Sequence, residues 1–211
     1  MQRRTGKANT NEKSFLILAS GSPRRRDLLY QMGVSFEVHC SGADEITSHV
    51  EGPLAMVKEN AKIKCLEVSK KFPDRFILGA DTTVSLKNQI FGKPSDLEEA
   101  REMLFGLSGK THDVSTGVCL SHQRLGYIET KVETSSVKFK EISGSTIDLY
   151  FEEIDPLDKA GAYAMQTRPD LIIEKYSGSR TNIIGLPVRL LEGWFSELRT
   201  LFPTQFLFTD R

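Results

Sequence analysis

The sequence predicts an α/β protein with a mixed β-sheet and helices on its faces, and two observations support this class. Short apolar strand segments alternate with helical segments over residues 14–80, which is typical of parallel strands. Long segments of alternating apolar and polar residues follow over residues 111–139 and predict antiparallel strands. The 211 residues contain no internal repeat and suffice for one large core or for two lobes that share a sheet.

Apolar runs, alternation and helical spacing define the elements of the first half. Strands are predicted at residues 15–18, 34–38 and 75–79, and helices at residues 23–32 and 53–72. Ser22 and Pro23 suit the N-cap and the first turn of the first helix, and Gly33 suits its end. A polar loop at residues 41–51 separates the second strand from the long helix.

The second half is predicted from turn residues, helix caps and alternating strands. Ser95 and Glu98 form a capping box for a helix that Gly106 ends. The other elements are a hairpin at residues 84–90, strands at residues 111–121, 126–139 and 171–175, a helix at residues 142–153, a polar loop at residues 178–185 and a last helix from Pro187. The apolar stripe of the last helix is Leu190, Leu191, Trp194, Leu198 and Leu201.

The helix at residues 53–72 carries an apolar stripe at helical spacing that is expected to face the core. Its members are Leu54, Val57, Ala61, Cys65, Val68 and Phe72. Lys64 lies on or beside this stripe, whereas most lysines of this helix can face water. Two interpretations stay open: Lys64 reaches the solvent at the edge of the helix, or it takes part in binding.

Three consecutive arginines in the first turn of the first helix are unexpected, because unpaired N–H groups make this end positive. Each cation there is unfavourable by about 0.3–1 kcal/mol unless an anion lies close by. The backbone N–H groups, the Ser20 and Ser22 hydroxyls and the guanidinium groups of Arg24 and Arg25 together suit a phosphate. The alternative is a solvated basic helix start.

Three segments are expected to share a cleft, because ligands of such folds lie beyond the carboxyl ends of the strands. They are residues 20–23 after the first strand, Asp81 after the third strand and Lys93 after the hairpin. Several polar residues are not explained by the predicted core. They are Arg24, Arg25, Glu45, Lys64, Asp81, Lys93 and Gln166. Cations with a pair of acids suit a polyphosphate held through a divalent metal. Taken singly, each of the acids and Lys93 also suits a solvated surface position.

Composition excludes several classes of function. With 28 basic and 28 acidic residues, the chain has no net charge to attract nucleic acid or an anionic membrane. Its three cysteines lack a CxxC motif, which favours reduced thiols in the cytoplasm, and its four histidines lack zinc-ligand spacing. No segment approaches the roughly 18 apolar residues of a membrane span. Residues 1–13 are expected to be a disordered tail before one domain at residues 14–211.

Motifs along most of the chain resemble those of the Maf family of nucleoside triphosphate pyrophosphatases, and they occur in the family's order. They are LASGSPRRRDLL (residues 18–29), ADE (43–45), NAKIKC (60–65), GADT (79–82), GKP (92–94), LSGKTHDVSTGV (107–118), DKAGAYAMQ (158–166) and GLP (185–187). The resemblance implies a fold similar to that of the inosine triphosphate pyrophosphatases, with a mixed twisted sheet, helices on both faces and two lobes around a cleft.

The resemblance also implies a reaction and roles for single residues. The reaction is hydrolysis of a nucleoside triphosphate to monophosphate and pyrophosphate by water attack at the α-phosphorus. The family's general base corresponds to Asp81 and its second acid to Glu45, and these two acids would hold Mg²⁺, or Mn²⁺ in its place. Its catalytic lysines correspond to Lys64 and Lys93. The phosphate-binding positions correspond to Ser20, Ser22, Arg24 and Arg25, and the positions linked to base choice to Arg24, Thr82 and Gln166.

The DKAGAYAMQ motif is similar to the form found in the subfamily that acts on dTTP and UTP. Two other functions stay open. One is the same reaction on modified purine nucleotides such as 7-methyl-GTP or dITP, and the other is a nucleotide-binding regulator of cell division without turnover. The pair of acids, Asp81 and Glu45, favours an enzyme, because binding of a polyanion alone would not require them. Members of the family are often dimers, so a homodimer is a candidate assembly.

Overall fold

The structure, a computed structural model, describes residues 16–206, so the expected tail of residues 1–13 lies outside the described residues. The described chain forms a seven-stranded sheet in the order β2-β1-β3-β5-β6-β7, with β4 paired to β3. The strands are β1 (Leu16–Leu18), β2 (Phe36–Val38), β3 (Phe76–Leu86), β4 (Gln89–Phe91), β5 (Thr111–His122), β6 (Tyr127–Phe139) and β7 (Ile173–Ser177). The helices are α1 (Pro23–Gln31), α2 (Pro53–Lys71), α3 (Leu97–Leu107), α4 (Gly144–Phe151), α5 (Pro169–Ile172), α6 (Arg180–Ile184) and α7 (Val188–Leu201).

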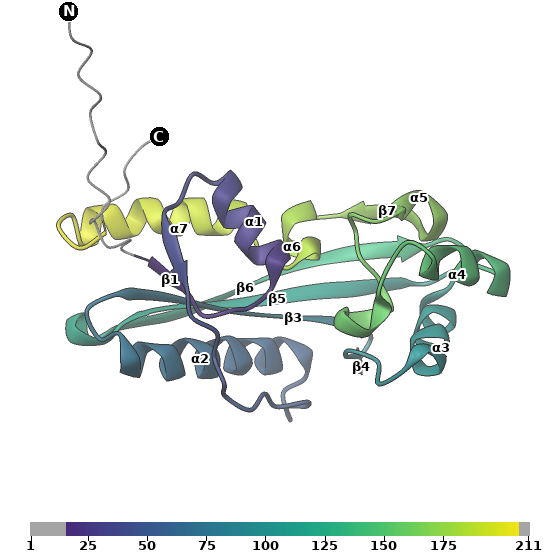
Figure 1. The fold of residues 1–211 in the computed structure, drawn as a ribbon, viewed down its shortest axis with the longest axis horizontal. Helices are drawn as coiled ribbons and strands as arrows, with labels where there is room; N and C mark the ends of the chain where they lie inside the picture. The colour runs from purple at the N-terminus through teal and green to yellow at the C-terminus, as the bar shows by residue number, and fades with distance from the viewer. Residues whose placement is uncertain (1–15, 207–211) are drawn as a thin grey trace, which may run out of the picture.

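The sheet is mixed, which confirms the predicted α/β class. β1 runs parallel to β2 and β3, whereas β3, β5, β6 and β7 follow one another in antiparallel order. Helices α1, α6 and α7 cover one face of the sheet and α2 covers the other, while α3, α4 and α5 gather at one end (Figure 1). No helix within residues 16–206 combines the length and the apolar character needed to span a bilayer.

Strand β3 differs from the prediction in a way that changes the position of Asp81. The sequence predicts a strand that ends at Gly79, with Asp81 in the following loop, but β3 continues to Leu86. The long strand β5 pairs with this extension, so that Asp81 lies opposite Gly117. The parallel pairing with β1 stops at Leu78. Asp81 therefore lies just beyond the carboxyl end of β1, although it is in the middle of β3.

The start and end of α3 also correct the prediction. The N-cap is Asp96 rather than Ser95, because the Asp96 carboxylate accepts a hydrogen bond from the Glu99 N–H at 2.8 Å. The Glu99 carboxylate accepts from the Ser95 N–H at 2.7 Å, one residue before the N-cap, so the predicted capping box of Ser95 and Glu98 is wrong. Gly106 does not end the helix, which continues to Leu107.

Three further expectations differ at exposed or short segments. Residues 178–185, predicted as a polar loop, contain the short helix α6, which begins after Ser179 because its hydroxyl accepts from the Asn182 N–H at 3.2 Å. Two members of the predicted apolar stripes face solvent, because they lie in the first turn of α2 and at the last residue of α7. These are Leu54, which is 49% exposed, and Leu201, which is 64% exposed.

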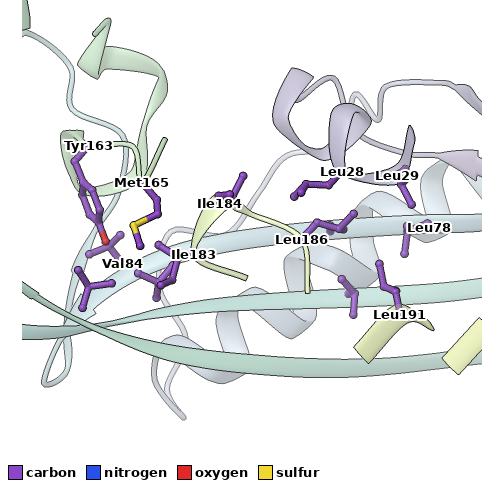
Figure 2. Close-up of a cluster of buried hydrophobic side chains, with 14 of the residues drawn as sticks. Leu28, Leu29, Leu78, Val84, Tyr163, Met165, Ile183, Ile184, Leu186 and Leu191 are labelled. Carbon is purple, nitrogen blue, oxygen red and sulfur yellow. The ribbon is translucent and has the colours of Figure 1, made fainter. Parts of the chain in front are cut away.

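Most buried apolar side chains form one cluster, in which the sheet packs against α1, α6 and α7 and, at one end, against α3 and α4. Figure 2 shows Leu28 and Leu29 of α1 above Leu78 of β3, while Tyr163 and Met165 lie at the other end of the cluster. The predicted residues Leu191, Trp194 and Leu198 of α7 are buried in this cluster and are joined by Phe195. This packing fixes α1, and with it the loop after β1, against the sheet.

Helix α2 packs closely on the opposite face because two glycines of the sheet lack side chains. A Cβ atom at Gly79 would lie 2.2 Å from the Ala61 carbonyl oxygen, and one at Gly117 would lie 2.3 Å from that of Val57. Both distances are far inside van der Waals contact, so any other residue would push the helix away. Gly79 precedes Asp81 on the same face, and Gly117 is its partner on β5. The polar residues of α2 can therefore reach Asp81.

Candidate active site

The side chains proposed from the sequence come together in the structure. All of them line one cavity of about 770 Å³, which the loop after β1, helix α2, strand β3, the loop after β4 and the segments next to α5 and α6 enclose. They are Ser20, Ser22, Arg24, Arg25, Glu45, Lys64, Asp81, Thr82, Lys93 and Gln166. The three segments expected to share a cleft therefore do share one.

Two acids and one lysine form the centre of the cavity. The Lys64 ammonium lies 2.8 Å from Asp81 Oδ1 and 2.8 Å from Glu45 Oε2. The side chains of Lys64 and Asp81 are each 11% exposed, whereas that of Glu45 is 50% exposed. Lys64 thus points into the cavity rather than to solvent at the edge of α2. A buried ion pair of this kind is held by charge on both sides, so that loss of either partner leaves the other uncompensated.

Arg25 anchors the loop after β1 to two other elements. Its guanidinium donates to the Gly185 carbonyl at 2.9 Å, to the Ser20 hydroxyl at 3.0 Å and to the Thr82 hydroxyl at 3.0 Å. Burial lowers the pKa of Arg25, and the negative charges of Asp81 and Glu45 oppose this effect. A guanidinium carries five N–H donors, so these three bonds leave two that can face a ligand.

The three arginines of α1 differ in their surroundings. Arg25 is buried, Arg24 lines the cavity and is partly exposed, and Arg26 is exposed and does not line the cavity. The interpretation of a solvated basic helix start therefore holds for Arg26 and is wrong for Arg25. The N-cap Ser22 makes no side-chain capping bond, so its hydroxyl is not used by the helix. Its N–H donates to the Ser20 hydroxyl at 3.3 Å.

Thr82 belongs to a different part of the cavity from Asp81, because successive residues of a strand point to opposite faces. Its hydroxyl contacts that of Thr116 at 2.9 Å and accepts from Arg25. The Thr116 hydroxyl donates in turn to the Asn182 carbonyl at 3.2 Å. This chain of hydrogen bonds joins α1, β3, β5 and α6 behind the cavity.

The exposed rim of the cavity carries three cations around Asp158. Asp158 lies 3.2 Å from the Lys93 ammonium, 3.3 Å from that of Lys159 and 3.5 Å from the Arg24 guanidinium. Partial burial raises the pKa of Asp158, but hydrogen bonds from the two lysines outweigh it and hold the pKa below its usual range. The Lys93 side chain is 66% exposed. Asp158 thus occupies cations that a phosphate would also bind.

One wall of the cavity is apolar. Tyr163, Met165, Val84 and Ile183 lie together at this wall (Figure 2). The Tyr163 hydroxyl lies 2.9 Å from His112 Nε2, and burial lowers the pKa of His112 to about 4. The imidazole is therefore neutral at pH 7.

Gln166 follows the apolar wall and is exposed at the edge of the cavity. The preceding residue, Met165, belongs to the core. An apolar wall with an amide at its edge suits an aromatic ring whose rim carries hydrogen-bonding groups.

The donor set around Asp81 fits a divalent metal only together with a substrate. Among residues 16–206 no three His, Cys, Asp or Glu side chains cluster as ligands of a metal ion. Asp81 and Glu45, however, share Lys64 as a neighbour and face the same cavity. Mg²⁺ is commonly bound by one or two carboxylates plus phosphate oxygens, and these two acids meet that requirement.

Two residues of the site escape the sequence prediction. Asn60 donates a hydrogen bond to Asp81 Oδ2 at 3.1 Å, and it lies four positions before Lys64 on α2. Helical spacing puts residues four apart on one face, which is the signal that could have identified it. Asp158 stands in the DKAGAYAMQ motif, but its contacts with Lys93 and Arg24 depend on tertiary structure.

Comparisons with known proteins agree with this arrangement. The family model described as Maf-like protein matches residues 15–198. A protein of Halalkalibacterium halodurans named dTTP/UTP pyrophosphatase is 44% identical over 173 residues, which cover 82% of this chain and 90% of that protein. A protein of the same name from Myxococcus xanthus is 41% identical over 177 residues, which cover 84% of this chain and 89% of that protein. This match over most of the chain shows that it belongs to the Maf family.

Proposed function

We propose that this protein hydrolyses nucleoside triphosphates, with dTTP and UTP as its substrates, to the nucleoside monophosphate and pyrophosphate. The observation that carries the proposal is the buried Asp81, held by Lys64 beside Glu45, in a cavity that Arg24, Arg25 and Lys93 also line. Relatives that are 40–44% identical and named dTTP/UTP pyrophosphatase support it. The activity belongs to one domain at residues 14–211.

Asp81 is the general base of the proposed reaction. It takes a proton from water, whose oxygen forms a bond to the α-phosphorus while the bond from that phosphorus to the bridging oxygen breaks. The two leaving phosphates depart as pyrophosphate and carry the negative charge away. Lys64 lies 2.8 Å from Asp81 Oδ1 and holds the carboxylate in place for this step.

The cations of the cavity bind the phosphates. Arg25 and Ser20 are buried at the start of α1, where backbone N–H groups also face an anion. Arg24 and Lys93 reach the same cavity from its rim and would exchange Asp158 for phosphate oxygens. Stabilising charge on a departing pyrophosphate is the main contribution that such cations make to catalysis.

Asp81 and Glu45 are the residues that would hold a divalent metal, for which Mg²⁺ is proposed and Mn²⁺ is a substitute. When bound, such an ion neutralises phosphate oxygens and polarises the phosphorus that is attacked. The half-exposed Glu45 can turn away from Lys64 toward a ligand, whereas Asp81 is held on both of its oxygens.

Base choice is assigned to Gln166, Thr82 and Arg24, which all line the cavity. The Thr82 hydroxyl is bonded to Arg25 and Thr116, so it supports the wall of the pocket, whereas Gln166 is exposed and can pair with the polar edge of a base. A site whose polar group pairs with one base edge discriminates against bases that leave this group unpaired. Homodimer formation and a cytoplasmic location stay predictions from the sequence.

The test is a panel of canonical and modified triphosphates with Mg²⁺, in which release of monophosphate and pyrophosphate is followed. We expect the highest kcat/KM for dTTP and UTP. If 7-methyl-GTP or dITP ranks first, the pyrimidine assignment is wrong, although the reaction class stands. If no triphosphate is turned over while nucleotides bind, the protein is a nucleotide-binding regulator and not an enzyme.

A further inference from the structure

Asn60 of α2 is 2% exposed and uses its amide on two partners at once. Its Nδ2 group donates to Asp81 Oδ2 at 3.1 Å and to the Ile46 carbonyl at 3.0 Å, while its Oδ1 accepts from the Ile46 N–H at 2.9 Å. The amide therefore bonds both backbone groups of Ile46, as a neighbouring strand would, and the free oxygen of Asp81 besides.

Ile46 follows Glu45 in a segment, residues 39–52, that contains neither helix nor strand. Such a segment has few backbone hydrogen bonds to hold it, so its position depends on side-chain anchors. Asn60 and Lys64 are the anchors that connect it to Asp81. Lys64 joins Asp81 to the Glu45 side chain, and Asn60 joins Asp81 to the backbone of the next residue.

We infer that Asn60 is a positioning residue for the proposed hydrolysis, which fixes the orientation of the Asp81 carboxylate and its separation from Glu45; this inference rests on the proposed function. With Oδ1 held by Lys64 and Oδ2 held by Asn60, the Asp81 carboxylate cannot rotate. Water and substrate then meet it in a single orientation, and reactions lose rate steeply when reacting groups are misplaced.

The chemistry of position 60 requires an amide. A leucine has a similar size but donates no hydrogen bond, so both Ile46 and Asp81 would be left with unpaired polar groups. An ionised aspartate accepts hydrogen bonds but cannot donate one, and it would add a second negative charge next to Asp81. The asparagine amide donates to Asp81 Oδ2 and to the Ile46 carbonyl oxygen, accepts from the Ile46 N–H, and adds no charge.

The experiment compares Asn60→Ala and Asn60→Asp with Asn182→Ala as the matched control. Asn182 is also a buried asparagine, but its amide donates to the Val114 carbonyl and the Ser135 hydroxyl rather than to an acid. kcat and KM for UTP and the Tm are measured for each purified protein. A fall of kcat without a matching change in KM separates positioning of Asp81 from a role in the fold alone.

Charged groups also face Asp81, and these variants leave them in place. They are Lys64 on α2, Glu45 in the loop and Arg25 on α1. In Asn60→Ala we expect kcat to fall about 10–100-fold, with a smaller change in KM, because Asp81 Oδ2 loses its partner while the phosphate-binding cations stay in place. In Asn60→Asp we expect a fall of the same size, because an ionised carboxylate has no hydrogen to donate to Asp81 Oδ2.

Asn182→Ala should lower the Tm and leave kcat near that of the wild type. The inference is overturned if both Asn60 variants behave like Asn182→Ala, with a changed Tm but a kcat near that of the wild type. It is equally overturned if neither variant folds, because Asn60 is then a determinant of the fold. A wild-type protein that hydrolyses no triphosphate would instead remove the proposed function.

Discussion

The inner part of the cavity and its rim are built differently, although both contain charged side chains. At the inner part the Lys64 and Asp81 side chains are 11% exposed, and Asp81 and Arg25 bond to partners that are buried or half-buried. At the rim, Lys93 is 66% exposed and Asp158 is 52% exposed. The inner part is therefore preorganised, whereas the rim can exchange its contacts with a ligand.

This difference predicts how substitutions behave. Breaking a buried ion pair costs about 3–5 kcal/mol, because an uncompensated charge remains, whereas an exposed pair contributes about 0–1 kcal/mol. Changes to the inner residues should thus alter both the rate and the stability of the protein. Changes at the rim should alter substrate affinity and base choice and leave the fold intact.

The largest effect is expected for Asp81→Asn. The amide keeps the size of the side chain but removes the base and the negative charge, so kcat should fall about 10²–10⁴-fold while nucleotide still binds. Turnover assays with UTP measure kcat, and equilibrium binding of UTP measures the affinity for the nucleotide. Asp44→Asn is the control, since Asp44 is an exposed acid of the neighbouring loop that does not line the cavity. A kcat within about threefold of the wild type would contradict the assignment.

Arg25→Ala is expected to raise KM and lower kcat together, and to lower the Tm. The substitution removes contacts to Gly185, Ser20 and Thr82, and a charge-assisted contact to phosphate is worth about 1.5–3 kcal/mol. Arg25→Lys should restore only part of the activity, because lysine lacks the planar fork. Arg26→Ala, in the same helical turn but exposed, is the control. Unchanged kcat and KM in Arg25→Ala would exclude a phosphate site at α1.

His112 predicts a pH dependence of stability for the apolar wall. Its pKa is lowered to about 4, so the unfolded chain, with a histidine pKa of about 6.5, takes up a proton first as the pH falls. Stability is therefore lost between pH 6.5 and 4, and about 2 kcal/mol of it between pH 7 and pH 5. Urea unfolding gives the free energy of unfolding at pH 7 and at pH 5. The difference between these two values should be smaller in His112→Gln than in the wild type by this amount. An unchanged difference would mean that His112 titrates normally.

Gln166→Ala is expected to act on specificity rather than on the fold. The gap in kcat/KM between UTP and GTP should narrow about tenfold, while the rate with the best substrate falls less, because a polar reader of the base is lost. The Tm should stay constant, since Gln166 is exposed at the rim. Gln123→Ala, at an exposed turn far along the chain, is the control. A uniform loss of rate with all nucleotides would place Gln166 outside base recognition.

The smallest effect is expected for Lys93 and Asp158. In Lys93→Ala, KM for the triphosphate should rise only a few-fold, and salt should reduce the difference, because the group is solvent-exposed. In Asp158→Asn, KM should fall, since the acid no longer competes with phosphate for Lys93 and Arg24. KM values determined at two ionic strengths test both variants. Lys70→Ala, on the exposed side of α2, is the control. A rise of KM in Asp158→Asn would show that the acid assists binding.

The sequence predicts the fold well where local signals are strong. The strands and most helices follow from alternation and helical spacing, and the mixed sheet follows from their order along the chain. Asp81 is misplaced in a loop because its strand is continued by the distant partner β5, a contact that local patterns do not report. The displaced cap at Asp96 and the exposed Leu54 show that element ends depend on the neighbouring packing.

The same distinction applies to the site. The family motifs identify the charged residues that meet in the cavity, but they do not reveal which of them are bonded. Lys64 is ambiguous on the helix, and only the close approach of α2 over Gly79 and Gly117 brings it to Asp81. Asn60 is missed because its side chain is neutral, whereas the sequence signals of this site are charged residues. Its importance comes from two contacts that tertiary structure creates.

The most direct test of the account is hydrolysis of UTP in water enriched in oxygen-18, with the label located in the products by mass spectrometry. Attack of water at the α-phosphorus, with Asp81 as the base, predicts that the label enters UMP and that pyrophosphate contains none. Label in pyrophosphate, or release of inorganic phosphate as the first product, would mean that water attacks a different phosphorus. The cavity would then hold the triphosphate in another register, and the roles given to its inner part and rim would be wrong.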